Sequence, residues 1–216
     1  MPDIFDEVDE ELRAERAQKL WERYGGLITG ALLLVVGAVG GWQGWEWWQN
    51  RQTVQAATSF LEIQQATAAE GADLAAMAAR FEALAGDAPA GYRTMALLRA
   101  AALRAEIGQR EEARAVWDRI SRDTGADPLY RDLATLLWAL HGVDSADPAT
   151  IEARLAPLTQ PGGAWRASAR EVQALLAIRR GQTEQARETL RALANDSTAP
   201  QGVRDRAGRL AAGLGG

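Results

Sequence analysis

The chain of 216 residues has a formal net charge of −5, with no cysteine and a single histidine. The lack of cysteine excludes disulfides, thiol nucleophiles and cysteine metal sites, and one histidine cannot build a histidine-rich metal site. The acidic excess lies in residues 1–50, which hold nine acidic and four basic side chains, whereas residues 51–216 hold twenty of each. A neutral C-terminal region without a basic stripe argues against nucleic acid as a partner.

Residues 1–23 begin with an acidic run and then place Phe5, Val8 and Leu12 at three- and four-residue steps. This spacing is compatible with a short amphipathic helix, and a solvated charged tail fits the composition as well. Either way, the sequence predicts an acidic tail ahead of a strongly apolar segment.

Residues 24–48 have the features of a membrane-spanning helix. No charged residue occurs between Tyr24 and Trp45, and these residues at roughly 1.5 Å each make a helix of about 33 Å, enough to cross a hydrocarbon core of about 30 Å. Aromatic side chains suited to the membrane interface flank both ends: Trp21, Tyr24, Trp42, Trp45, Trp47 and Trp48. A cleaved signal ending near Ala38-Val39-Gly40 and a buried soluble helix are the alternatives. The long acidic leader and the aromatic continuation favour a permanent anchor.

Basic residues near the ends of the span predict its orientation. Those that precede the span are Arg13, Arg16, Lys19 and Arg23, whereas only Arg51 follows within twenty residues. The positive-inside rule then keeps the N-terminus in the cytoplasm. In a Gram-negative cell, the chain is therefore predicted to be a single-pass inner-membrane protein with residues 49–216 in the periplasm.

The glycines of the span fall on one helical face. At about 100° per residue, a sector of roughly 100° holds Gly26, Gly30, Gly37, Gly40, Gly41 and Gly44. Such a stripe lets another helix approach closely, because packing drives helix association in lipid. We expect a helix-packing face here, with another protein or a second copy of the chain as the partner.

Residues 49–216 show helical periodicity throughout and no alternating run long enough for a strand. Asp127-Pro128 and Asp147-Pro148 fit an N-cap followed by proline in the first helical turn. Glycines predicted at turns within helix pairs are Gly71, Gly108, Gly142 and Gly181. The expected fold is all-α, with a single transmembrane helix followed by a tetratricopeptide-like α-solenoid of about four helix hairpins.

A duplicated turn supports the repeat interpretation. The stretch "GQREEAR" at Gly108–Arg114 returns as "GQTEQAR" at Gly181–Arg187, with five of seven positions identical and a spacing of 73 residues. Two units of about 36 residues approximate the 34-residue period of tetratricopeptide repeats. We therefore expect Gly108 and Gly181 to close one helix of each pair, and Ala113 and Ala186 to allow close packing of the next.

No constellation in the sequence predicts catalysis or a cofactor. His141 lies beside the predicted turn at Gly142 and is expected to interact with free carbonyls at a helix end. A P-loop and a dinucleotide fingerprint are absent. Function is therefore expected from surfaces, since stacked helix hairpins form an extended concave groove. Trp138 lies in a leucine-rich pattern and is predicted to be core, and the groove residues we predict are Tyr92, Arg93, Arg99 and Trp165.

The order of tail, glycine-rich span and degenerate repeats resembles the YfgM family of ancillary translocon subunits. The likeness covers nearly the whole chain and is carried by "GAVGGWQGWEWWQNRQ" after the span, "GYRTMALLRAAALRA" in the second unit and "GAWRASAREVQALLAIRRGQTEQAR" in the fourth. The resemblance implies a non-enzymatic protein that contacts the SecYEG channel and a PpiD-like periplasmic chaperone. Its repeats would then assist newly translocated client polypeptides.

Two other functions remain open from the sequence. One is a repeat scaffold for cell-envelope or division machinery. The other is a structural membrane protein that self-associates as a homodimer through its glycine face.

Overall fold

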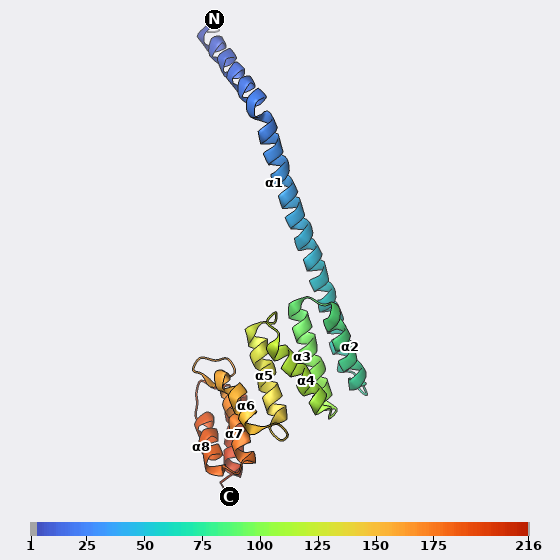
Figure 1. Ribbon diagram of the computed structural model, residues 1–216, viewed down its shortest axis with the longest axis vertical. Helices are drawn as coiled ribbons and strands as arrows, with labels where there is room; N and C mark the ends of the chain where they lie inside the picture. The colour runs from blue at the N-terminus through green and yellow to red at the C-terminus, as the bar shows by residue number, and fades with distance from the viewer. Residues whose placement is uncertain (1–3, 216) are drawn as a thin grey trace. The chain divides into compact units, whose positions relative to one another are not determined.

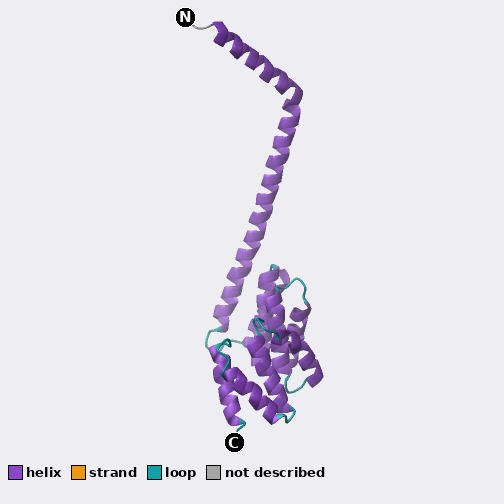
Figure 2. Cartoon of the chain, turned by 90° about the vertical axis from the view of Figure 1, so that its left-hand side faces the viewer, coloured by secondary structure: helices purple, strands orange, loops and turns teal. Residues whose placement is uncertain are grey.

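The structure, a computed structural model, describes the backbone of residues 4–215 and most side chains from Trp21 onward, with residues 22, 23 and 28 excepted. Within that range every secondary-structure element is a helix (Figure 2), which confirms the predicted all-α fold. The chain forms two compact units, Met1–Gln52 and Thr53–Gly216. The elements are α1 (Ile4–Thr67), α2 (Leu74–Asp87), α3 (Ala90–Glu106), α4 (Arg110–Arg122), α5 (Pro128–Gly142), α6 (Pro148–Leu155), the 3₁₀ turn η1 (Ala156–Thr159), α7 (Arg166–Arg179), α8 (Thr183–Ala194) and α9 (Gln201–Gly213).

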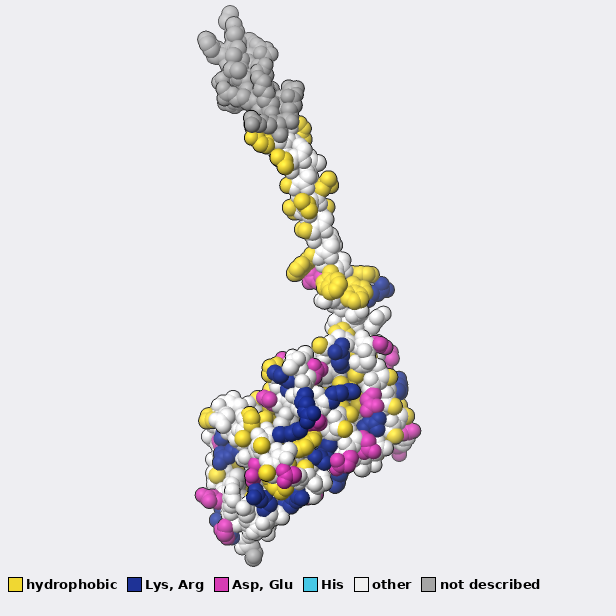
Figure 3. Space-filling view, viewed as in Figure 1, with side chains coloured by type: hydrophobic (Ala, Val, Ile, Leu, Met, Phe, Trp, Pro, Cys, Tyr) yellow, Lys and Arg dark blue, Asp and Glu magenta, His cyan; other side chains and the backbone are white. Residues whose placement is uncertain are grey.

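Helix α1 is unbroken from Ile4 to Thr67 because no proline occurs between Pro2 and Pro89. Its segment Tyr24–Thr67 is long and apolar enough to cross a membrane, and only 6% of the most apolar stretch is buried. Figure 3 shows hydrophobic side chains exposed along this segment. The predicted apolar face of the tail, with Phe5 and Val8, lies outside the described side chains.

The helices of the second unit begin and end at local signals. The Asp127 carboxylate accepts a hydrogen bond from the Leu129 amide at 2.8 Å, and the Asp147 carboxylate accepts one from the Thr150 amide at 2.9 Å. Both aspartates are followed by proline in the first helical turn, so the two predicted N-caps are confirmed.

The duplicated stretch folds into the same turn twice. Gly108 and Gly181 have φ of 86° and 74°, a left-handed conformation that glycine adopts without steric cost. The Gln109 amide donates to the Arg104 carbonyl at 2.8 Å, and the Gln182 amide donates to the Ala177 carbonyl at 2.9 Å, which caps the preceding helix each time. Five residues after each glycine, Ala113 and Ala186 are fully buried.

Gly142 serves a different purpose from the predicted turn. It is the last residue of α5, and it does not have a positive φ. A Cβ atom at this position would lie 3.1 Å from the Arg114 Nε atom. A side chain is therefore disfavoured here by close packing against α4, whereas Gly71, with φ of 74°, lies in the left-handed region at the turn between α1 and α2.

The helices of the second unit follow one another in space in chain order (Figure 1), and their apolar faces form two clusters. Helix α7 contributes to both clusters from different faces: Ala169, Val172 and Leu176 join the larger one, whereas Ala167 and Ala174 join the one formed with α8 and α9. A helix buried on two sides by its neighbours is typical of a solenoid in which each repeat contacts only the next.

Two tryptophans fill the core where α4, α5 and α6 meet. The Trp117 side chain is only 1% exposed, and its ring centroid lies 4.6 Å from that of His141. Trp138 is also buried, as predicted, and it lies between two guanidinium groups, with the Cζ atoms of Arg154 and Arg114 at 3.9 and 4.9 Å from the ring centroid. Such cation–π contacts hold both arginine side chains in place.

We expect His141 to make the stability of the repeat domain depend on pH. Burial against Trp117 and, to a smaller degree, the positive charge of Arg110 lower the pKa of His141 below its usual value of 6.5. Above about pH 6.5 the imidazole is neutral in both folded and unfolded chains. Below it, the unfolded chain binds the proton more readily, so we expect stability to fall as the pH drops toward the folded-state pKa.

The test compares the midpoint of thermal unfolding, Tm, between pH 7.5 and pH 5 for the full chain and for His141→Gln. Between pH 7.5 and pH 5, the Tm of His141→Gln should fall by less than the Tm of the unchanged chain. An identical pH profile for the two proteins would contradict this role of the imidazole.

Candidate protein-interaction surface

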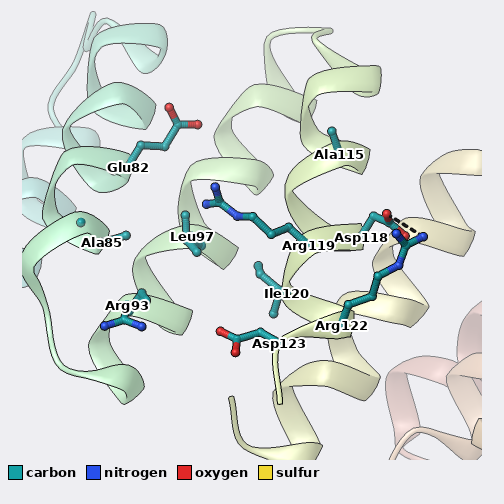
Figure 4. A pocket seen from close by; sticks show the side chains of 11 residues that line it. Glu82, Ala85, Arg93, Leu97, Ala115, Asp118, Arg119, Ile120, Arg122 and Asp123 are labelled. Atoms are coloured by element: carbon teal, nitrogen blue, oxygen red, sulfur yellow. Dashed lines mark ion pairs between the residues drawn. The ribbon is translucent and has the colours of Figure 1, made fainter. Parts of the chain in front are cut away.

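A pocket of about 700 Å³ opens between α2, α3 and α4. It forms because α2 and α4 both pack against α3. Its floor is apolar and includes Ala85, Leu97 and Ile120, each of which is buried. Figure 4 shows charged side chains from all three helices around this floor. The combination of an apolar floor and a polar rim is common in sites that bind ligands and peptides.

Two of the three acidic residues that line the pocket, Glu82 and Asp118, form ion pairs with arginines. Glu82 of α2 forms a bidentate ion pair with Arg104 of α3, with distances of 2.7 Å to Nε and 2.8 Å to Nη2. This contact is the main cause of a raised pKa for Arg104. Asp118 of α4 contacts Arg154 at 2.6 Å and Arg122 at 3.0 Å. These pairs hold the helices in register, and Asp123 is the lining carboxylate for which no ion pair is described.

The arginines of the pocket are more accessible than its acids. Arg93, Arg119 and Arg122 line it and are all exposed. In Figure 4 the Arg119 side chain extends from α4 across the pocket toward Leu97 of α3. Asp123, at the end of α4, accepts a hydrogen bond from the Gly125 amide at 2.9 Å.

The structure separates the four predicted groove residues. Only Arg93 lines the pocket. The Tyr92 ring lies 6.3 Å from that of Phe60 in α1, and the Arg99 Nε atom donates to Gln64, also in α1, at 3.0 Å. Trp165 is further along the solenoid, where its indole N–H donates to the Leu129 carbonyl at 3.0 Å.

Sequence reasoning missed the charged residues that complete the pocket, namely Glu82, Asp118, Arg119 and Arg122. The available signal was the dense charge pattern of α4, "REEARAVWDRISR". That pattern identifies a polar helix face, but it does not indicate which neighbouring helices frame that face.

The apolar part of α1 offers a second surface. A Cβ atom built on any of the glycines of the predicted packing face meets no other atom within 4 Å: Gly26, Gly30, Gly37, Gly40, Gly41 and Gly44. Beyond this face, Trp45 and Trp48 stack with ring centroids 5.4 Å apart, and Arg51 Cζ lies 5.1 Å from the Trp47 ring centroid. Amphipathic rings with a neighbouring cation suit the headgroup region of a membrane.

Among the described residues, no group of three or more metal-ligating side chains comes together. The side chains that line the pocket offer apolar contacts, hydrogen bonds and ion pairs, which are the interactions found in protein interfaces.

No curated protein and no solved structure matches the chain significantly. The family model described as a tetratricopeptide repeat-like domain matches residues 18–206, which is most of the chain. Members of such repeat families characteristically bind other proteins through stacked helix pairs. The match agrees with the duplicated glycine turns and with the solenoid packing of α7. The chain therefore belongs to the tetratricopeptide repeat-like domain family.

Proposed function

We propose that this protein is a single-pass inner-membrane protein whose repeat domain, residues 49–216, binds partner proteins in the periplasm and has no catalytic role. The observation that carries the proposal is the joining of two features in one chain. An apolar helical segment is left almost wholly exposed, helices with a core of their own follow it, and the repeat-family match at residues 18–206 includes both.

The exposed segment supports a membrane anchor. Large apolar side chains such as Leu34 and Val35 are 75% and 61% exposed, which is unfavourable in water and favourable in lipid. The tryptophans that flank the segment support a span, and the basic residues before it support an orientation with the N-terminus in the cytoplasm. Fusion of a reporter that is active only outside the cytoplasm to the C-terminus tests this orientation. Activity only of a cytoplasmic reporter would reverse it.

We propose further that the partners are the SecYEG channel, a PpiD-like chaperone and newly translocated polypeptides. Support for this part comes from the resemblance to the YfgM family in the span and in two repeat units. The test is purification of the full chain in mild detergent, followed by identification of co-eluting proteins. A preparation that contains neither channel nor chaperone would contradict the assignment.

A second experiment separates handling of client polypeptides from a scaffold role in cell-envelope or division machinery. A photocrosslinking residue is placed in the repeat domain, and newly made secreted chains are pulse-labelled. Crosslinks to the labelled chains are expected for client handling. Crosslinks only to stable envelope proteins would favour the scaffold.

Self-association is a second candidate, because the open space above all six glycines of the packing face leaves room for another helix. Because the chain has no cysteine, single cysteines along residues 26–44 report contacts without background. Disulfide-linked homodimers at Gly30 and Gly37 but not at Val35, which lies on the opposite side of the helix at about 100° per residue, would place a second copy on this face. Crosslinks to a different membrane protein would place a partner there instead.

A further inference from the structure

We propose that the pocket between α2, α3 and α4 binds an acidic segment of a partner polypeptide, with Arg93 and Arg119 pairing with its carboxylates. This inference rests on the proposed function, that the repeat domain binds proteins, and it names the chemistry of the segment that is bound.

The first argument is the balance of charge. The lining residues and their direct partners include five arginines but only three carboxylates: Arg93, Arg104, Arg119, Arg122 and Arg154 against Glu82, Asp118 and Asp123. Arg104 of α3 neutralises Glu82, and Arg154 of α6 neutralises Asp118, whereas no ion pair is described for Asp123. The pocket therefore presents a net positive charge to a ligand.

The pairs that neutralise the acids are held firmly. Arg154 is stacked on Trp138 at 3.9 Å, so its guanidinium stays beside Asp118. Both Nε and Nη2 of Arg104 bind Glu82, which is the strongest geometry for an arginine and a carboxylate. Glu82 and Asp118 are thus not paired with Arg93 or Arg119, whereas Arg122 shares Asp118 with Arg154.

The second argument concerns the two arginines without an acidic partner. Among the described residues, neither Arg93 nor Arg119 forms an ion pair with a carboxylate. The one hydrogen bond described for the Arg93 side chain is a long one, 3.4 Å, to the Ala88 carbonyl. Guanidinium groups that border a protein-lined cavity are screened less than those on a flat surface, and their planar fork suits a carboxylate.

The third argument favours a polypeptide over a small anion. A volume of about 700 Å³ falls in the range of roughly 300–1,000 Å³ that is typical of ligand sites. The buried floor of Ala85, Leu97 and Ile120 is apolar, so an inorganic anion would leave it uncovered. A segment with carboxylates next to small apolar side chains would cover both the rim and the floor. The chain's own acidic run lies across the membrane in the proposed topology, so the segment belongs to another protein.

The test measures binding of two fluorescently labelled peptides to the full chain in micelles of an uncharged detergent. One peptide alternates glutamate and alanine, and the other replaces each glutamate with glutamine. The wild-type protein should bind the glutamate peptide at least tenfold more tightly, and this preference should shrink as salt is added. The double variant Arg93→Gln/Arg119→Gln should lose the preference.

Arg209→Gln is the matched control, because Arg209 is an exposed arginine of α9 without a described partner. It should keep the preference, and all variants should keep the wild-type circular dichroism spectrum. As a second variant, Arg119→Glu should reduce binding of the glutamate peptide and increase binding of a lysine–alanine peptide. This change of preference in Arg119→Glu tests the pocket even if the double variant does not fold.

Equal affinity of the wild-type protein for the two peptides would overturn the proposal. It would also be overturned if Arg209→Gln lost the preference for the glutamate peptide as fully as the double variant does. Displacement of the peptide by millimolar inorganic phosphate, or by phosphatidylglycerol added to the micelles, would show an anion or lipid site instead. If crosslinks to translocated chains persist in cells that carry the double variant with undiminished yield, the pocket assignment fails while the proposed function stands. Loss of those crosslinks in the double variant, but not in Arg209→Gln, supports both the pocket assignment and the proposed function.

Discussion

Trp117→Ala is expected to lower the free energy of unfolding of the repeat domain by about 3–5 kcal/mol. Trp117 is among the largest fully buried side chains, with 1% of its surface exposed, and it fills the core beside His141. Its removal leaves a cavity that helices α4 and α5 can close only in part. The measurement is urea unfolding of the full chain in micelles, followed by circular dichroism.

A comparison of two phenylalanine variants tests the cause of this loss. The indole N–H of Trp117 has no hydrogen-bond partner among the described residues, so Trp117→Phe removes an unsatisfied donor and should cost much less than Trp117→Ala. Trp165→Phe removes a donor that binds the Leu129 carbonyl, which should cost about 0.5–1.5 kcal/mol from the hydrogen bond alone. A loss below about 1 kcal/mol for Trp117→Ala would contradict the central packing role, given the usual cost of such truncations.

Leu34→Arg is expected to release much of the protein from the membrane. Leu34 lies near the middle of the uncharged segment and is 75% exposed. An arginine at the centre of a spanning helix costs about 2.5–3.5 kcal/mol, and the favourable contribution of the leucine is lost as well. The measurement is the fraction of protein that stays with the membrane after alkaline carbonate extraction.

Two variants control for the substitution itself. Leu34→Met keeps an apolar side chain at the same position and should behave as the wild type. Leu61→Arg places the same charge on another exposed leucine of α1, 58% exposed, beyond the predicted span, and it should leave membrane retention unchanged. Equal retention of Leu34→Arg and wild type would argue against a lipid-embedded segment.

Local features of the fold could be predicted from the sequence because their causes are local. Proline after aspartate fits the first turn of a helix, so the N-caps at Asp127 and Asp147 were predictable. Glycine tolerates a positive φ, so the turns at Gly108 and Gly181 were predictable from a duplicated heptapeptide. A long uncharged stretch also indicates a membrane span from the sequence alone, because its length and composition are properties of one continuous segment.

The groove residues were harder to predict because neighbouring positions on a helix point in different directions. Tyr92 and Arg93 are adjacent in sequence, but one residue turns the helix by about 100°. Tyr92 and Arg99, seven residues apart, therefore both face α1, while Arg93 lines the pocket with α4. Residue type alone does not distinguish these faces.

What the sequence determined by itself is the helical character of the chain, the positions of several caps and turns, and the presence of an apolar segment suited to a membrane. Only the tertiary structure decided which charges meet. Asp118 pairs with Arg154, and Arg93 of α3 and Arg119 of α4 line one pocket that three helices build. The physical reason is range: propensity and capping act over a few residues, whereas ion pairs and pockets depend on how separate helices pack.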